Sequence, residues 1–138
     1  MTRSFFNSKA DIWDEKIGEK DPDKLEDMAK NLDIQPGYIV LDVGTGTGIF
    51  VPFLLKKIGD TGKLVCLDSA EKMLEKAQNK NFKGNIEYVC GDICSTQLGD
   101  GIFDVVVCYY SFPHFKDKTK DLQEIKRLLK KDGKLFIC

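Results

Sequence analysis

The sequence predicts an α/β fold with a doubly wound parallel sheet of five strands and helices on both faces. Short runs rich in β-branched residues recur from residue 38 onward, and segments with helical spacing of apolar residues separate them. The runs are almost continuously apolar, as is typical of parallel strands covered on both faces. Strand–helix repeats of this length join parallel strands through right-handed crossovers. The expected strands are residues 38–43, 63–68, 86–90, 103–110 and 134–138.

Start and stop residues bound the expected helices. Asp21 and Ser69 are expected to cap the helices that follow them, and Asp132-Gly133 is expected to end the last helix. The stretch Leu98–Gly101 is too short and polar for a full helix, so a loop or a single turn is expected between the third and fourth strands. The expected helices are residues 8–17, 22–32, 48–58, 69–80 and 117–131.

The chain divides into a helical N-terminal segment, residues 1–37, and a sheet-forming part, residues 38–138. A chain of 138 residues is long enough to bury a sizeable core. We therefore expect the two parts to form one domain, in which residues 1–37 serve as a lid or cap.

Composition excludes several classes of partner. The chain has 21 lysines and arginines against 22 acidic residues and contains no basic block, so no nucleic-acid partner is expected. No apolar run approaches the roughly 20 residues that span a bilayer, and the N-terminus has no apolar signal-peptide region. We therefore expect no membrane partner and a cytoplasmic location.

The five cysteines are expected to be reduced. Cys66, Cys90, Cys108 and Cys138 lie in or at the end of apolar, strand-like runs, where cysteine behaves as a small hydrophobic residue of the core. Cys90 and Cys94 are four residues apart, but no second Cys/His pair completes a zinc set in a chain with a single histidine. No metal site is expected.

The stretch Tyr38–Gly48, YIVLDVGTGTG, leads from an apolar run through an acid into alternating glycines. Gly44, Gly46 and Gly48 allow a ligand to approach the main chain closely, because no Cβ stands in the way. Asp42 precedes the first glycine by two residues, and its carboxylate would repel a diphosphate. We therefore expect a ligand that carries positive charge.

A second acid, Asp68, follows the last glycine by 20 residues, at the end of the second expected strand. An acid at about this distance hydrogen-bonds the hydroxyls of a ribose, although Asp68 could instead cap the following helix. The glycine spacing departs from the G-x-G-x-x-G of dinucleotide sites, because Gly44-Thr45-Gly46 is followed by Thr47-Gly48. An NAD-dependent oxidoreductase is therefore disfavoured against a protein that binds a cationic adenosine derivative.

Five segments follow one another in chain order: VLDVGTGTG, LDSAEKML, CGDI, FDVVVCYYSFPHF and LQEIKRLLKKDGKLFI. Together they resemble the class I S-adenosylmethionine-dependent methyltransferases, and in particular the small-molecule group that includes quinone-biosynthesis enzymes. The resemblance covers residues 38–138 and implies a Rossmann-like fold, S-adenosylmethionine as cofactor and S-adenosylhomocysteine as product. It also implies that this sequence stops before the last two strands of that fold.

The resemblance assigns the methionine and ribose parts of the cofactor to the ends of three strands. Asp42 would hold the methionyl ammonium, either directly or through water. The backbone of Gly44–Gly46, which includes Thr45, would pass beneath the methionine. Asp68 would accept from the ribose hydroxyls, and Tyr109 would approach the methionine from the fourth strand.

The same resemblance places the adenine near the ends of the second and third strands. Met73 would pack on the ring, Asp92 would accept from its amino group, and Ile93 would lie beside it. Ser69, at the end of the second strand, would border the same ligand. Met73 is at least as well suited to a core position, and Asp92 could simply form a Gly-Asp turn.

No catalytic residue stands out as clearly as the cofactor site. His114 follows the fourth strand and could act as a general base near neutral pH, but a lone histidine among aromatic residues is more often a packing residue. Phe5, Phe6 and Trp13 could form a lid or could simply fasten the N-terminal helices to the sheet.

The sequence thus predicts methyl transfer to a small-molecule acceptor. The alternative is a domain that binds S-adenosylmethionine but is catalytically incomplete, because the last two strands of the family are missing. The fifth strand would then be an open sheet edge, which could pair with a second copy of the chain to form a homodimer.

Overall fold

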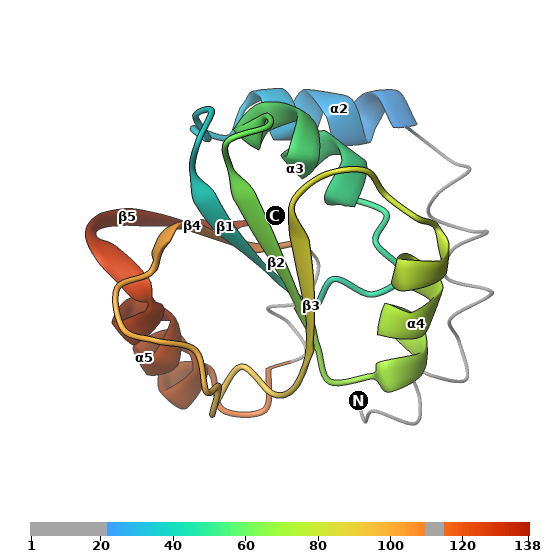
Figure 1. The fold of residues 1–138 in the computed structure, drawn as a ribbon. Coiled ribbons are helices and arrows are strands. Elements are labelled where there is room, and N and C mark those ends of the chain that lie inside the picture. Colours follow the sequence, from blue (N-terminus) through green and yellow to red (C-terminus); the bar gives the residue numbers. More distant parts are fainter. Residues whose placement is uncertain (1–21, 110–114) are drawn as a thin grey trace.

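The computed structural model describes residues 22–109 and 115–138, which form a parallel sheet flanked by helices (Figure 1). In chain order the elements are α2 (Pro22–Lys30), β1 (Ile39–Val43), α3 (Val51–Ile58), β2 (Lys63–Asp68), α4 (Glu71–Asn79), β3 (Ile86–Cys90), β4 (Phe103–Cys108), α5 (Lys118–Leu128) and β5 (Leu129–Ile137). The strand order is β3-β2-β1-β4-β5, and every pairing is parallel. The predicted doubly wound, Rossmann-like sheet is confirmed. None of the helices in the described ranges is long and apolar enough to cross a bilayer.

Two hydrophobic cores lie on opposite faces of the sheet. One face packs against α2 and α3 through side chains such as Val40 and Leu54, and the other packs against α5 through Leu41 and Ile125. In Figure 1, α2 and α3 lie above the sheet and α5 lies below it. Because side chains alternate along a strand, Asp42 shares the α3 face with Val40.

The last helix and the fifth strand meet earlier than predicted. α5 ends at Leu128 and β5 begins at Leu129, so Asp132-Gly133 lies inside the strand and does not end the helix. The carbonyls of the last two residues of α5 accept hydrogen bonds from the amides of Gly101 and Ile102. The helix therefore ends against a loop that is distant in sequence, which local stop signals do not reveal.

The predicted cap of α4 is also wrong. Ala70 directly precedes the helix, and no side-chain hydrogen bond caps it there. Asp68, not Ser69, supplies the local hydrogen bond, because its Oδ1 accepts from the Ala70 amide at 2.8 Å. The helix predicted over residues 8–17 and the predicted cap Asp21 lie outside the described residues.

All five cysteines are free, but they differ in burial. Cys66 and Cys108 are buried, as predicted, whereas Cys138 is half-buried and Cys90 is exposed. Cys90 ends β3, which lies at one edge of the sheet. The predicted core position is therefore wrong for Cys90, because an apolar run at a sheet edge is not covered on all sides.

The connection from β3 to β4 contains no helix, as predicted for this crossover, and side chains of α5 hold it in place. The Glu124 carboxylate accepts from the amide and the hydroxyl of Thr96 at 2.9 and 2.8 Å. Arg127 donates to the Leu98 carbonyl at 2.9 Å and to Glu124 at 2.6 Å. The Arg127 guanidinium holds the pKa of Glu124 down at about 2, so this clamp stays charged across the ordinary pH range.

Lys57 of α3 fastens the end of α2. Its Nζ donates to the carbonyl oxygens of Ala29, Lys30 and Leu32 at 2.8, 3.3 and 2.7 Å. Carbonyls at a helix C-terminus have no partner within the helix, and a cation there also offsets the negative end of the helix dipole. Lys57 thus joins the two helices that cover one face of the sheet.

Replacing Lys57 by methionine is expected to lower the free energy of unfolding by about 2 kcal/mol, because hydrogen bonds from a charged donor are lost while the aliphatic stem is kept. Lys56→Met is the matched control, since the Lys56 side chain is 77% exposed and pairs with Glu26 at 3.6 Å. Exposed pairs contribute little. Urea denaturation measures both variants, and equal losses would contradict the role of Lys57.

Candidate functional site

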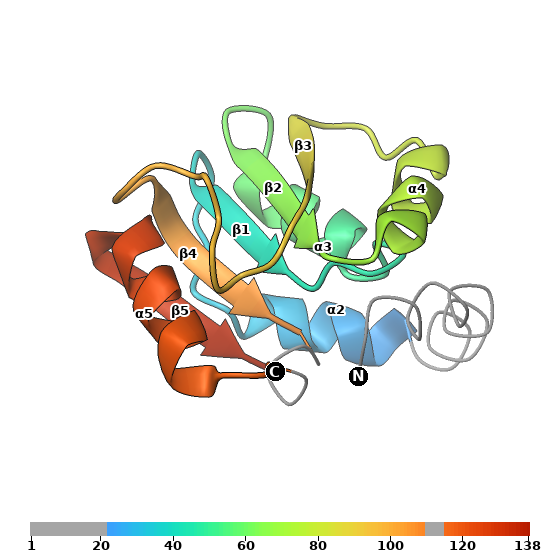
Figure 2. The same cartoon turned by 90° about the horizontal axis from the view of Figure 1, so that it is seen from below.

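The carboxyl ends of β1, β2 and β4 lie next to one another. Open parallel sheets bind ligands at the carboxyl ends of their strands. Figure 2 shows the arrowheads of these strands side by side. The strand order reverses at β1. Asp42 lies near the end of β1, Asp68 ends β2, and Tyr109 follows β4. Three of the predicted site residues therefore lie at the carboxyl ends of neighbouring strands.

The glycine loop, residues 44–48, joins β1 to the start of α3 and is held against the end of β2. The amides of Gly44 and Thr45 donate to the Leu67 carbonyl at 2.8 and 3.1 Å. Gly46 and Gly48 have φ of +61° and +83°, which a side chain would strain, and α3 accordingly starts later than predicted. Apart from its chain neighbours, the Gly44 carbonyl oxygen, at 4.0 Å, is the one described atom that a Cβ on Gly46 would meet. As far as the described residues show, this side of the loop leaves room for a ligand.

Asp42 is the buried acid of the site. Its residue is 2% exposed, and its Oδ2 accepts a hydrogen bond from the Thr45 hydroxyl at 2.9 Å. Among the residues that the structure describes, no donor reaches Oδ1. Burial raises the pKa of Asp42 to about 7, and the nearby charge of Asp68 adds to the rise. The site therefore contains a carboxyl group that needs a proton or a cation near neutral pH.

Asp68 joins the glycine loop to α4. Its Oδ2 accepts from the Gly46 amide at 2.7 Å, and its Oδ1 accepts from the Ala70 amide at 2.8 Å. Burial raises the pKa of Asp68, and these two hydrogen bonds oppose the rise. Each carboxylate oxygen still has a lone pair for a further donor. The neighbouring Ser69 is half-buried, and its carbonyl accepts from the Cys90 thiol at 3.8 Å.

The three residues predicted around an adenine lie in α4 and in the turn after β3. Met73 is 2% exposed and Ile93 is 5% exposed, and Ile93 belongs to the core beside α5. Asp92 is exposed, and its carbonyl accepts from the Ser95 amide at 3.2 Å. The structure thus shows a buried Met73 and a turn at Asp92, while their contact with a ligand stays a prediction.

Two contacts near the carboxyl ends of the strands were not predicted from the sequence. The Thr45 hydroxyl orients Asp42, and a threonine three residues after an acid is a recognisable signal for such a local bond. The rings of Phe50 and Tyr109 stack with centroids 4.8 Å apart and planes at 24°. No sequence signal announces this stack, because its two members are far apart in the chain.

The remaining candidates cannot be placed at the site. His114, Phe5, Phe6 and Trp13 lie outside the described residues. Within residues 22–109 and 115–138, no group of three His, Cys, Asp or Glu side chains is arranged to hold a metal ion. The site as described therefore consists of the glycine loop, two acids and an aromatic stack.

The chain is similar to known methyltransferases over most of its length. Residues 41–137 match the protein family described as a methyltransferase domain. The ubiquinone/menaquinone biosynthesis C-methyltransferase UbiE of Hydrogenovibrio crunogenus is 32% identical over 108 residues, covering 75% of this chain and 42% of that protein. UbiE of Escherichia coli O1:K1 is 33% identical over 108 residues, with 75% and 43% covered. The chain thus spans less than half the length of these curated relatives.

Solved structures agree with this similarity. A SAM-dependent methyltransferase from Aquifex aeolicus has a TM-score of 0.78 and 28% identity, over 94% of this chain and 68% of that one. Phosphoethanolamine N-methyltransferase 2 of Haemonchus contortus, in complex with phosphomonomethylethanolamine and S-adenosylhomocysteine, has a TM-score of 0.71 and 25% identity, over 80% and 26%. The family match, the sheet order and the resemblance of the glycine loop agree, and the chain belongs to the class I S-adenosylmethionine-dependent methyltransferases.

Proposed function

We propose that this chain binds S-adenosylmethionine at the glycine loop and transfers its methyl group to a small, quinone-like acceptor. The observation that carries the proposal is the buried Asp42 carboxyl, one oxygen of which has no donor among the described residues. A ligand with an ammonium and a sulfonium group supplies the missing positive charge, whereas the diphosphate of NAD would be repelled. The open side of the loop at Gly46 gives such a ligand room to reach the backbone.

The methionine and ribose parts each have candidate partners at the strand ends. The ammonium would lie against Asp42, and the backbone of Gly44–Gly46 would lie beneath the methionine chain. Asp68 already accepts from an amide of the loop, so ribose hydroxyls that donate to Asp68 would be tied to the same structure. Tyr109, stacked on Phe50, would close the methionine side.

The adenine would lie beside the turn that follows β3. Asp92 is exposed there, which leaves its carboxylate available to the amino group of the ring. Met73 and Ile93 would supply apolar contact, and Ser69 would border the ribose. These assignments follow the family resemblance, and the position of the residues near the ends of β2 and β3 supports them.

The bound cofactor supplies a methyl group on a sulfonium, which is a good leaving group for an in-line displacement. The residues of the chain have to direct this methyl group toward the acceptor and keep water away. Asp42 would fix the cofactor on one side of the sulfur through the ammonium, and Asp68 would fix it on the other side through the ribose. Two anchors on either side of the reactive atom define the direction of its methyl group.

The acceptor class is inferred from the relatives. The UbiE proteins are named as C-methyltransferases of ubiquinone and menaquinone biosynthesis. An aromatic carbon of a quinol that attacks the methyl group must afterwards lose a proton, so a general base assists such a reaction. His114, which follows β4 in the sequence, is the residue that we propose for this role.

Binding without turnover is the second candidate function. Pairing of β5 with a second copy is part of the same proposal, since β5 lies at an edge of the described sheet, and a cytoplasmic location is proposed for either function.

Calorimetric titration with S-adenosylhomocysteine tests the cofactor site. Asp42→Asn keeps the shape of the side chain and removes its charge, so it is expected to weaken binding at least about tenfold, through the loss of a charge-assisted hydrogen bond. Asp68→Asn is expected to weaken binding to a similar degree. Asp60→Asn is the matched control, because Asp60 is exposed in the turn after α3, and it is expected to leave the affinity unchanged.

NAD is expected not to bind or compete in the same titrations. Tight binding of NAD without any response to S-adenosylhomocysteine would refute the proposed cofactor. An Asp42→Asn variant with wild-type affinity would show that the ammonium is held elsewhere.

Methyl transfer to a demethylated benzoquinol or naphthoquinol is the expected activity, read by mass spectrometry as the gain of one methyl group. His114→Ala is expected to lower the rate at least about a hundredfold through the loss of the base, while the affinity for S-adenosylhomocysteine stays the same. Cofactor binding without methyl transfer to any of a broad panel of acceptors would favour the second candidate function.

A further inference from the structure

We propose that Phe82, in the segment between α4 and β3, is a positioning residue for the glycine loop. The inference rests on the proposed function, because it names the side chain that sets the position of the loop beneath the cofactor. Phe82 has no polar atom and lies outside the strand ends, so it has no chemistry of its own to offer the reaction. It would act through Gly48.

The ring of Phe82 packs on the backbone of Gly48. A Cβ on Gly48 would lie 2.8 Å from Cε2 and 3.3 Å from Cζ of Phe82, and 3.2 Å from the Cβ of Ala77. Such spacing leaves no room for a side chain, so the α-carbon of Gly48 is in close contact with the ring. The φ of +83° at Gly48 places a turn of the main chain at this contact.

Gly48 is the joint between the glycine loop and α3. Its amide donates to the Thr45 carbonyl at 3.1 Å, and its carbonyl accepts from the Val51 amide at 3.1 Å. The first hydrogen bond closes the glycine turn, and the second leads into the helix. A side chain that packs on Gly48 therefore supports both the glycine loop and the start of α3.

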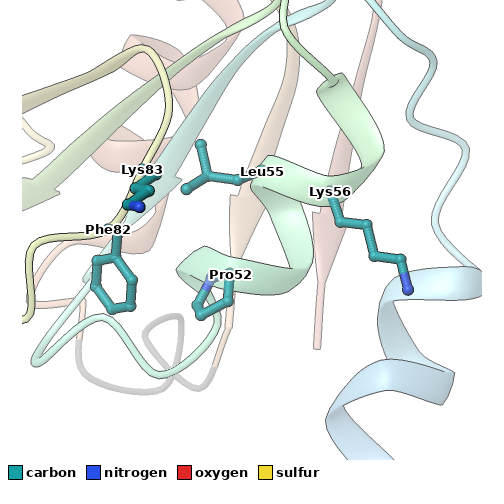
Figure 3. Close-up of a pocket in the computed structure, with 5 residues that line it drawn as sticks. All are labelled: Pro52, Leu55, Lys56, Phe82 and Lys83. Atoms are coloured by element: carbon teal, nitrogen blue, oxygen red, sulfur yellow. The ribbon is translucent and has the colours of Figure 1, made fainter.

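A second contact fastens the Phe82 segment to α3. A Cβ on Gly84 would lie 2.9 Å from Cδ2 of Leu55, so the backbone at Gly84 packs on that side chain. Phe82 and Leu55 also line a surface hollow of about 280 Å³, and Figure 3 shows them on either side of it. Phe82 is half-buried and packs against the margin of the core on the α3 face. Gly48 lies on one side of it and this hollow on another, so shortening its side chain removes support from the loop.

Amide hydrogen exchange in the ligand-free protein and titration with S-adenosylhomocysteine test the proposal together. Phe82→Ala is expected to raise the exchange rates of the Gly48 and Val51 amides at least about tenfold, because local opening becomes easier. It is expected to weaken S-adenosylhomocysteine binding by a similar factor. Lys83→Ala is the matched control, since it shortens the neighbouring exposed side chain that lines the same hollow, and both readouts should stay close to wild type.

Phe82→Leu lacks the same two ring atoms but keeps more apolar bulk, so a smaller change in the same direction is expected; it replaces the alanine variant if that variant does not fold. Wild-type exchange at Gly48 and Val51 in the folded variant would overturn the proposal. A rise shared equally by the amides of β1 and β4 would overturn it as well, because it reports global destabilisation. If the wild-type chain does not bind S-adenosylhomocysteine, the proposed function fails, whereas the exchange comparison still decides the role of Phe82.

Discussion

The architecture of the site depends on one buried carboxyl group beside a glycine turn. Asp42 belongs to β1, which has a strand on each side, and it is 2% exposed. Water cannot solvate a charge in that position, and the Thr45 hydroxyl satisfies one of the two oxygens. A proton in the free protein, or a cation from a ligand, would neutralise the negative charge of this carboxylate. The sign of the ligand charge therefore follows from the place of the acid in the sheet.

The glycine loop is shaped by contacts from outside itself. The Leu67 carbonyl and the Asp68 carboxylate hold its amides from the end of β2, and Phe82 packs on Gly48 from the segment after α4. Because these contacts are made by the protein itself, we expect them to order the loop before a ligand binds. A loop that is already ordered loses less conformational entropy when a ligand arrives.

Local signals account for what could be predicted from the sequence. Apolar runs indicated the strands. The alternating glycines indicated a turn after the first strand, and with it that Asp42 and Asp68 lie together at the carboxyl ends of the strands. The end of α5 could not be predicted, because Gly101 and Ile102, which donate to its last carbonyls, belong to another loop. The prediction that Cys90 is buried was wrong for a related reason, because an apolar run does not reveal which strand will be the outermost strand of the sheet.

Carbon-13 NMR titration of the Asp42 carboxyl tests most directly whether this group is protonated in the free protein and binds a cation of the ligand. Burial raises its pKa to about 7, so the ligand-free protein is expected to show a midpoint near that pH. The free energy of unfolding should then fall as the pH rises from about 4 to about 7, because over that range the native state holds a proton that the unfolded state has lost. Saturating S-adenosylmethionine should lower the midpoint, because its positive charge favours the carboxylate. A ligand-free midpoint near 4, or a raised midpoint that S-adenosylmethionine leaves unchanged, would contradict this role of Asp42.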